Sequence, residues 1–511
     1  MTFPRKILEI GQLGAWAQKA REKNLAVVHC HGVFDLLHPG HIEHLEEAKS
    51  LGSLLCVTVT ADDQVNKGPG RPMLCAEDRA RMLAALEIVD VVSISRETNG
   101  VLAIKNLRAD FFVKGPDYSN PESDPTGNIQ KEINAVEESG GKLHITRGDT
   151  MSSSKLRNDI YLAKGDELSE FLQRLRQVTS QNELDLLFAR ILDLKVLVVG
   201  EAIIDNYISC EALGKSSKDP VLAFKPLSTE SHLGGSLAIA RHVAGLGAKT
   251  TLLTRVGKDR KTSLRIQAEI GGLIDLMLVE SENEPTIEKT RFLDSLTGNK
   301  VFETYQIGES VASKADSEEL LTNLRSVIGD FDLVLVADYG HGLLDSGVIS
   351  ELSSHARLLS VNTQSNAGNR GFNTISKYPR LDVVVLNGAE VALELREKHL
   401  RMEVLVPELL ERTQAKFVGV TMGAKGLIYG VKGETGIAVE TVPAFSTVVK
   451  DRVGAGDALF AVTSVALAAE ASPLVASLLG NLAGAASIAE LGNRVTIDRT
   501  SLLRHASATL K

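Results

Sequence analysis

The chain has 511 residues, of which 43% are apolar and 24% are charged. This length exceeds what one hydrophobic core accommodates and predicts two or three domains, and the composition is ordinary for a globular protein. The formal net charge of -9 excludes a general attraction to nucleic acids or membrane surfaces, so anionic small molecules must be bound at local sites.

Cysteine usage and hydropathy indicate the compartment. The four cysteines lack CxxC spacing and are Cys30, Cys56, Cys75 and Cys210. This pattern favours a reducing cytoplasm and argues against structural zinc. The first 23 residues contain no long apolar core, and no later stretch is long and apolar enough to span a bilayer. We therefore expect a cytoplasmic protein that is neither secreted nor inserted into a membrane.

The first alternation of strands and helices contains a nucleotide-binding turn. A leading helix within residues 1–24 precedes an apolar strand at 25–30, and the sequence HGVFDLLHPGH follows before a helix at 42–51. A glycine turn between a strand and a helix places phosphates against the helix N-terminus. His38 and His41 lie in that first turn, where they can stabilise the charge that develops on an α-phosphate. Metal-binding or capping histidines are the alternative.

This motif resembles the HxGH signature of the cytidylyltransferase-like nucleotidyltransferases. The likeness continues through strands at 54–60 and 89–94 to FFVKGPDY at 111–118, a strand that ends in a basic loop. The run MSSSKLR at 151–157 resembles the second phosphate-binding motif of that family, although a serine run alone is more often a helix cap. The resemblance implies catalytic roles for His38, His41 and Lys114, nucleotide contacts from Gly32, Phe34, Asp35, Ser152, Ser153, Ser154 and Arg157, and substrate contacts from Asp117 and Arg147.

The middle of the chain predicts a connector between two domains. Apolar residues recur at helical spacing among many charges from residue 160 to about residue 194. Such a segment packs on its neighbours and is not a free linker. We therefore predict a nucleotidyltransferase domain at 1–160, a helical connector at 161–194 and a second domain at 195–511.

The second half alternates again between strands and helices. Strands are predicted at 195–200, 250–256, 333–337, 358–361, 383–386 and 417–421, and one of the helices is predicted at 237–246. Regular alternation predicts a parallel sheet with helices on both faces, so the expected fold class is α/β with two doubly wound domains. The extended stretches 208–224 and 291–305 are candidates for a small β-lid over the site.

The run DRVGAGDALF at 451–460 indicates the chemistry of this half. Gly454 and Gly456, with Ala455 between them, allow the backbone N–H groups to converge, and the apolar helix predicted at 458–469 directs its N-terminus at them. Asp457 then lies where it can take a proton from an attacking hydroxyl. A helix N-cap after a glycine loop is the alternative interpretation of GxGD alone.

The second half resembles the ribokinase-like (PfkB) sugar kinases, in which the GAGD loop is the most diagnostic motif. NGAE at 387–390 matches their NxxE motif, and TMGAKG at 421–426 matches their TxGxxG turn. The resemblance implies Asp457 as the general base, an anion hole at Gly454–Gly456 and Mg²⁺ placed by Asn387 and Glu390. It further implies nucleotide contacts from Thr421, Gly423, Gly426, Gly454, Ala455 and Gly456 and acceptor contacts from Asp205, Gly234 and Gly235.

Together the two halves resemble the bifunctional heptose 7-phosphate kinase/heptose 1-phosphate adenylyltransferase family, with the domain order reversed. The resemblance implies an NDP-sugar product, ATP as the kinase donor, ATP or CTP as the nucleotidyl donor, Mg²⁺, a sugar or sugar-phosphate substrate and a homodimer formed through the kinase lid.

The chain departs from that family at three places. Residues 237–239 offer no amide where the family has an asparagine, and NTQ at 362–364 replaces Asp-Pro-Lys. Arg147 precedes the serine run, as in the glycerol 3-phosphate cytidylyltransferases. Two alternatives therefore stay open: a CTP-dependent enzyme for a different sugar or polyol phosphate, and a nucleotide- or sugar-binding regulatory module with an inactive domain.

Overall fold

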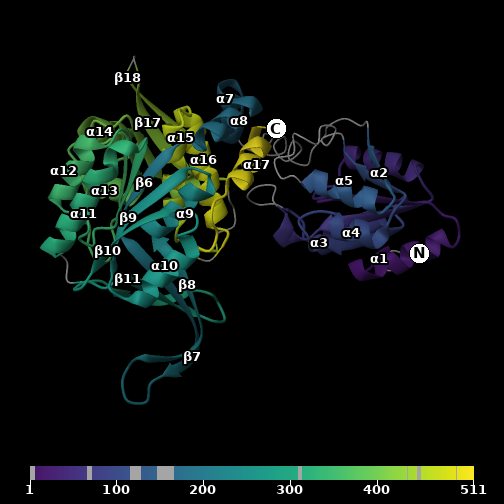
Figure 1. Cartoon of the computed structure of the whole chain (residues 1–511), viewed down its shortest axis with the longest axis horizontal. Coiled ribbons are helices and arrows are strands. Elements are labelled where there is room, and N and C mark those ends of the chain that lie inside the picture. The colour runs from purple at the N-terminus through teal and green to yellow at the C-terminus, as the bar shows by residue number, and fades with distance from the viewer. Residues whose placement is uncertain are drawn as a thin grey trace. The chain divides into compact units, whose positions relative to one another are not determined.

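The computed structural model describes residues 6–65, 72–115, 128–146, 166–308, 313–433, 436–445, 450–490 and 492–510. The chain divides into two compact units, which consist mainly of Met1–Ser169 and of Glu170–Ala506. Each unit is built on a mainly parallel sheet with flanking helices, which confirms the predicted α/β class (Figure 1). Within the described ranges, no helix has both the length and the apolar character that crossing a membrane requires.

The first unit contains a five-stranded sheet in the order β3-β2-β1-β4-β5, with all neighbours parallel. The strands are β1 (Val27–Gly32), β2 (Leu54–Thr60), β3 (Val91–Ser95), β4 (Phe111–Lys114) and β5 (Lys142–Ile145). The helices are α1 (Leu13–Arg21), α2 (Pro39–Ser50), α3 (Ala76–Ala85), α4 (Val101–Leu107) and α5 (Asn128–Glu138). The strand order reverses at β1, and ligands of open α/β sheets bind at such a point.

The second unit contains a nine-stranded sheet in the order β10-β9-β6-β13-β14-β15-β16-β17-β18. The strands are β6 (Lys195–Gly200), β9 (Lys249–Gly257), β10 (Asp275–Ser281), β13 (Leu333–Asp338), β14 (Leu359–Thr363), β15 (Val383–Asn387), β16 (Phe417–Thr421), β17 (Leu427–Gly433) and β18 (Gly436–Val442). The strands from β10 to β16 are parallel, whereas β17 and β18 form an antiparallel hairpin at one edge. The predicted alternation did not include this hairpin.

Helices cover both faces of that sheet (Figure 1). On one face, α11 (Lys314–Val327), α12 (Ser346–His355), α13 (Gly388–Leu395) and α14 (Met402–Thr413) share a buried apolar cluster with the strands. On the other face, α9 (Ser236–Gly245), α15 (Ala455–Ala468) and α16 (Pro473–Ser487) pack together. The helices α15 and α16 are buried almost all round, as a helix that is apolar on every side must be. The remaining helices are α7 (Asp166–Val178), α8 (Gln181–Ile191), α10 (Arg260–Ile270) and α17 (Arg499–Leu510).

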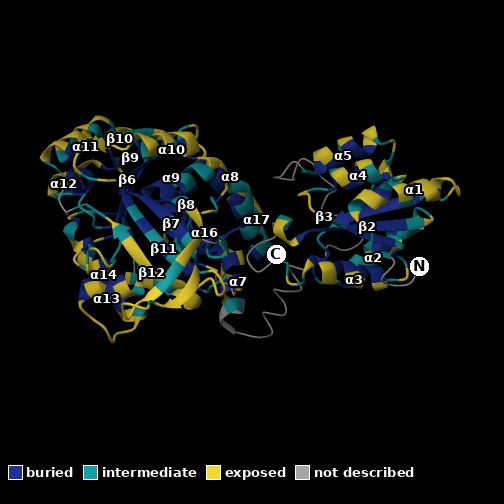
Figure 2. Ribbon diagram, turned by 90° about the horizontal axis from the view of Figure 1, so that it is seen from below, coloured by how far each residue is buried: buried dark blue, intermediate teal, exposed yellow. Residues whose placement is uncertain are grey.

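A separate four-stranded sheet lies where the sequence predicted a lid. Its order is β12-β11-β7-β8, with β7 (Ala202–Lys215), β8 (Leu222–Gly235), β11 (Ile287–Asp294) and β12 (Lys300–Gln306). The β7–β8 hairpin extends away from the nine-stranded sheet (Figure 1). Most of β12 is exposed (Figure 2). Every second residue of β11 is buried. The buried face of β11 presents Lys289 and Arg291.

Candidate functional site

The helix α15 begins at the glycine loop that the sequence singles out. Gly454 is its N-cap and has a φ of 82°, in the left-handed region that favours glycine. A Cβ atom at Gly454 would lie 1.9 Å from Oδ1 of Asn493. The Nδ2 of Asn493 donates a hydrogen bond of 3.1 Å to Oδ2 of Asp205. The glycine thus lets the loop approach the asparagine that holds Asp205.

Asp457 lies in the first turn of α15 and is half-buried. The hydroxyl of Tyr339 donates a hydrogen bond of 2.9 Å to its Oδ1. Desolvation raises the pKa of Asp457 to about 6, although the hydrogen bond from Tyr339 acts in the opposite direction. A carboxylate with a pKa just below neutral is mostly ionised at neutral pH and can accept a proton.

Asp205 is buried beside this carboxylate and is paired with a lid residue. Its Oδ1 lies 2.6 Å from Nη1 of Arg291, and both side chains are less than a tenth exposed. A Cβ atom at Gly234 would lie 2.0 Å from Oδ2 of Asp205, and Gly235 has a φ of 58°. The three predicted acceptor residues Asp205, Gly234 and Gly235 therefore lie together. Their neighbour Arg291 was not predicted.

Two lysines of the lid complete the charged groups of this site. Lys289 is buried, and its Nζ lies 5.2 Å from the ring centroid of Tyr305 and 5.6 Å from that of Tyr339. The Nζ of Lys300 lies 2.6 Å from Oδ1 of Asp451, the first residue of the DRVGAGDALF run. No motif marked these lysines. Lys289 could have been found from its position on the buried face of β11, in which buried and partly buried residues alternate.

Asn387 and Glu390 form a capping box at the start of α13. Asn387 accepts hydrogen bonds of 2.9 Å from the backbone N–H groups of Ala389 and Glu390, and Glu390 accepts one of 2.8 Å from the N–H of Asn387. The other oxygen of Glu390 accepts a hydrogen bond from the N–H of Ser365 at 3.0 Å. Burial raises the pKa of Glu390 to about 7.

Glu390 fits an indirect role in metal binding. Both of its oxygens already accept a backbone N–H, and each keeps a second lone pair. Mg²⁺ retains several waters in protein sites and is held by one or two carboxylates together with substrate phosphates. In the part of the chain that the structure describes, no three His, Cys, Asp or Glu side chains cluster as a ready metal site.

The predicted nucleotide turn lies at the same edge of the sheet. Thr421 ends β16 and pairs in register with Asn387 at the end of β15. Gly426 has a φ of 87°, and a Cβ atom there would lie 2.1 Å from the carbonyl oxygen of Val442. Gly423 has a φ of 60°. The turn therefore brings Thr421, Gly423 and Gly426 to the carboxyl edge that carries Asn387.

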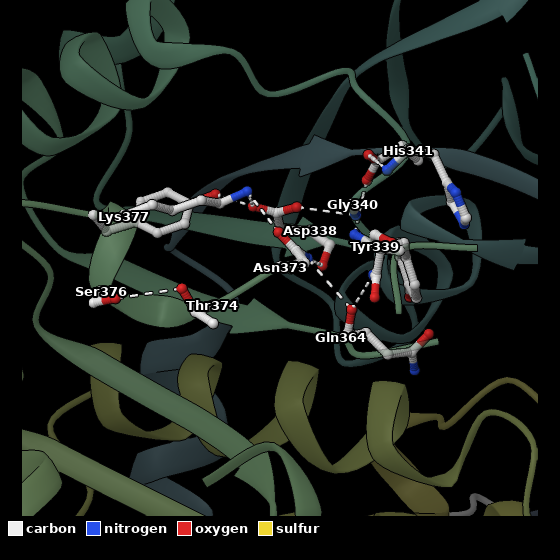
Figure 3. A network of polar contacts seen from close by, with 12 residues as sticks. Asp338, Tyr339, Gly340, His341, Gln364, Asn373, Thr374, Ser376 and Lys377 are labelled. Atoms are coloured by element: carbon white, nitrogen blue, oxygen red, sulfur yellow. Dashed lines mark hydrogen bonds and ion pairs between the residues drawn. The ribbon is translucent and has the colours of Figure 1, made fainter. Parts of the chain in front are cut away.

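A buried polar network joins the end of β13 to the loop after β14. Figure 3 shows Asn373 and Lys377 directed toward Asp338, next to Tyr339. The Nζ of Lys377 lies 2.6 Å from Oδ2 of Asp338, and Asn373 donates a hydrogen bond of 2.7 Å to the carbonyl oxygen of Asp338. Asn362 donates to the carbonyl oxygen of Val385 at 2.6 Å. The amide of Asn362 is therefore used within the sheet.

The HPGH motif of the first unit lies at the start of α2. His38 is the N-cap of this helix, and the rings of His38 and His41 stack with centroids 3.8 Å apart. Phe34 has a φ of 49° and lies 5.4 Å from the ring of His41. Gly32 ends β1. The Oδ1 of Asp35 accepts the N–H groups of residues 73 and 74 at 2.7 and 3.1 Å, so this side chain shapes the loop.

Lys114 ends β4, which neighbours β1 in the sheet. Its Nζ lies 2.7 Å from Oε2 of the buried Glu132. Arg79 belongs to no predicted motif. Its side chain is fully buried, donates to the carbonyl oxygens of Val33, Thr60 and Leu74 and pairs with Asp62. The other predicted residues of this unit lie outside the described residues: Asp117, Arg147, Ser152, Ser153, Ser154 and Arg157.

Two family models match this chain. The pfkB family carbohydrate kinase model matches residues 193–499, and the cytidylyltransferase-like model matches residues 29–159. The chain belongs to the pfkB carbohydrate kinase family. This pfkB match covers the second unit, from β6 to the start of α17, and the cytidylyltransferase-like match covers the HPGH motif of the first unit.

The curated relatives are similar in the N-terminal domain of this pfkB protein. "Bifunctional protein HldE" of Geobacter metallireducens is 37% identical over 154 residues, which are 30% of each chain. "Bifunctional protein HldE" of Campylobacter fetus subsp. fetus is 41% identical over 119 residues, which are 23% of this chain and 25% of that protein. The chain thus spans about 30% or less of these relatives. In this chain the cytidylyltransferase-like domain precedes the pfkB domain, which is the reverse of the usual order in HldE proteins.

Solved structures of phosphofructokinase-2 from Escherichia coli share the fold of the pfkB half. The complex with potassium aligns with a TM-score of 0.51 and 17% identity, and covers 62% of this chain and 99% of that one. The complex with substrates and products aligns with a TM-score of 0.50 and 15% identity, and covers 61% of this chain and 97% of that one. At these identities the likeness shows the fold alone.

Proposed function

We propose that this protein is a bifunctional enzyme that makes an NDP-sugar. The pfkB half transfers the γ-phosphoryl group of ATP to a hydroxyl, the anomeric one, of a sugar or sugar phosphate. The other half joins the resulting sugar phosphate to a nucleoside triphosphate and releases pyrophosphate. The observation that carries the proposal is the surroundings of Asp457, a half-buried carboxylate at the N-terminus of a buried helix, with a hydroxyl donor on one oxygen.

In the kinase half, Asp457 takes the proton of the acceptor hydroxyl as its oxygen attacks the γ-phosphorus. The backbone N–H groups of Gly454, Ala455 and Gly456 face the transferring phosphoryl group and stabilise its negative charge. Asp205, held by Arg291 and Asn493, receives hydroxyls of the acceptor. Asn387 and Glu390 would hold Mg²⁺, which would supply charge neutralisation on the phosphates.

In the nucleotidyltransferase half, the stacked His38 and His41 stabilise the pentacoordinate α-phosphate. Lys114 exchanges its contact with Glu132 for a phosphate oxygen when the triphosphate binds. The nucleotide is ATP or CTP. The family resemblance favours ATP and a heptose, whereas Arg147 favours CTP and a polyol phosphate.

We further propose that the protein is a cytoplasmic homodimer formed through the lid. Exposed apolar side chains on the lid strands and their connections support the dimer: Leu213, Val221, Leu222, Leu227 and Phe302. Four of these side chains belong to the β7–β8 hairpin, and apolar patches on a surface are typical of a protein interface. Analytical ultracentrifugation would detect the dimer, and replacement of Leu222 and Leu227 by serine is expected to yield monomers.

The two half-reactions can be separated by phosphorus NMR. The purified protein is incubated with ATP, CTP and a panel of heptose and other sugar phosphates. The variant Asp457→Asn is expected to lose the sugar 1-phosphate signal and to keep pyrophosphate release when a sugar 1-phosphate is supplied. His41→Asn is expected to show the reverse pattern.

Three outcomes discriminate among the alternatives. Normal phosphorylation by Asp457→Asn would disprove the assignment of the base. Pyrophosphate release from a sugar phosphate and CTP, but not from the same sugar phosphate and ATP, would identify a cytidylyltransferase. Tight nucleotide binding with no turnover of any acceptor would indicate a binding module.

A further inference from the structure

Tyr339 is buried in the kinase half, and its backbone is held at both ends. Its N–H donates a hydrogen bond of 2.9 Å to Oε2 of Glu201. Its carbonyl oxygen accepts hydrogen bonds from Nδ2 of Asn366 at 2.7 Å and from Nδ2 of Asn369 at 3.0 Å. The whole residue is only 3% exposed. The backbone contacts and the burial of the ring together restrict where the hydroxyl lies.

The asparagines that hold Tyr339 belong to a loop that is itself ordered by hydrogen bonds. Asn369 also donates to the carbonyl oxygen of Gln364 at 2.7 Å, and its Oδ1 accepts the N–H groups of Asn366 and Gly371. The N–H of Ser365 donates to Glu390, so the loop is joined to the start of α13. The amides of Asn366 and Asn369 are thus used on backbone groups, in the loop that follows the NTQ stretch at 362–364.

The hydroxyl of Tyr339 contacts the carboxylate of Asp457 at the N-terminus of α15. The bond from Tyr339 to Oδ1 of Asp457 is 2.9 Å long and joins residues 118 positions apart. A donor on one carboxylate oxygen limits rotation of the group and leaves the other oxygen for a second partner. Lys289 packs on the face of the same phenol ring, with its Nζ 5.6 Å from the ring centroid.

We propose that Tyr339 is a positioning residue for the kinase reaction. Its hydroxyl holds Oδ1 of Asp457 so that Oδ2 faces the acceptor hydroxyl, and Asn366 and Asn369 act on the reaction through Tyr339, not through the sugar. The inference rests on the proposed function for the role of Asp457. It adds a role for this loop: Asn366 and Asn369 support the base through Tyr339.

The test first follows the protonation of Asp457 without any acceptor. Infrared difference spectra between the protein and its Asp457→Asn variant isolate the carboxyl band, and a pH titration gives the pKa. The same pair of spectra is recorded in a Tyr339→Phe background. Because the lost donor favoured the ionised form, we expect the pKa of Asp457 to rise by about one unit.

The second readout is the pH profile of phosphorylation of the acceptor found by phosphorus NMR. In Tyr339→Phe, the acid limb of kcat moves to higher pH by the same amount, and KM for ATP stays within about twofold. Asn369→Ala shifts the limb in the same direction by less, and the effects of Asn369→Ala and Tyr339→Phe are not additive, since both act through one contact.

Tyr378→Phe is the matched control. Its buried hydroxyl donates a hydrogen bond of 2.6 Å to Asp338 in the neighbouring network, and this variant is expected to leave the titration of Asp457 unchanged. An unshifted pKa of Asp457 in Tyr339→Phe would overturn the proposal even if the protein is an active kinase. A shifted pKa in a protein that phosphorylates no acceptor would leave the positioning contact established and would refute the proposed kinase function instead.

Discussion

Replacing Gly454 by alanine should destabilise the pfkB half and loosen the contacts of Asp205. An L-residue at a φ of 82° costs about 1–2 kcal/mol relative to glycine. The new Cβ would lie 1.9 Å from Oδ1 of Asn493, so this side chain must move away from Asp205. The loss of a hydrogen bond to a charged group costs about 1.5–3 kcal/mol. Alanine also lowers the conformational entropy of the unfolded chain, which offsets part of this cost. We therefore expect the free energy of unfolding to fall by about 2–4 kcal/mol.

Gly456→Ala is the matched comparison, because the same substitution falls two residues away in the same loop. No atom lies within 4 Å of its added Cβ, and the residue is already helical. Alanine there should stabilise the protein by about 0.5–1 kcal/mol.

Since the chain has two units, unfolding is best followed locally, by hydrogen exchange of α15 and α16 peptides across a urea series. Equal stability of Gly454→Ala and the unaltered protein would refute the reasoning on strain and collision.

Three further predictions concern other groups. Phosphorylation should slow about tenfold per pH unit below about pH 6, as Asp457 becomes protonated; a pH–rate profile flat to lower pH would contradict this. Lys300→Met leaves the buried Asp451 without its cation and should cost about 2–3 kcal/mol in urea unfolding, whereas Lys258→Met removes only an exposed pair and should change nothing measurable. Arg79→Met removes the donor of three backbone carbonyl oxygens and should prevent stable folding of the first unit, seen as lost protection of β1 and β2 from hydrogen exchange.

Patterns within short windows of the sequence were sufficient to predict the fold class of the two α/β halves. The strands at 54–60, 195–200 and 417–421 have the predicted limits, because a buried parallel strand is a continuous apolar run with a turn at each end. The lid was predicted from two extended stretches and is formed by β7, β8, β11 and β12. The edge hairpin of β17 and β18 was missed, since strand direction depends on pairing with a neighbour.

The candidate kinase site likewise has features that local sequence rules predict and features that they do not. Gly454, Gly456 and Asp457 are neighbours in sequence, so their backbone geometry and shared helix start could be predicted from local rules. The roles assigned to these residues remain predictions.

Only the tertiary structure reveals what surrounds Asp457. Tyr339 donates to it across 118 positions, and Asn493 reaches Asp205 across 288. Such contacts depend on how β13, the lid and the α16–α17 connection pack against one another, and no local sequence pattern predicts this packing. The sequence thus determined the glycine loop and the helix start that carry Asp457. The packing of distant segments decided which groups hold the Asp457 carboxylate in place, because hydrogen bonds depend on distance in space and not on separation along the chain.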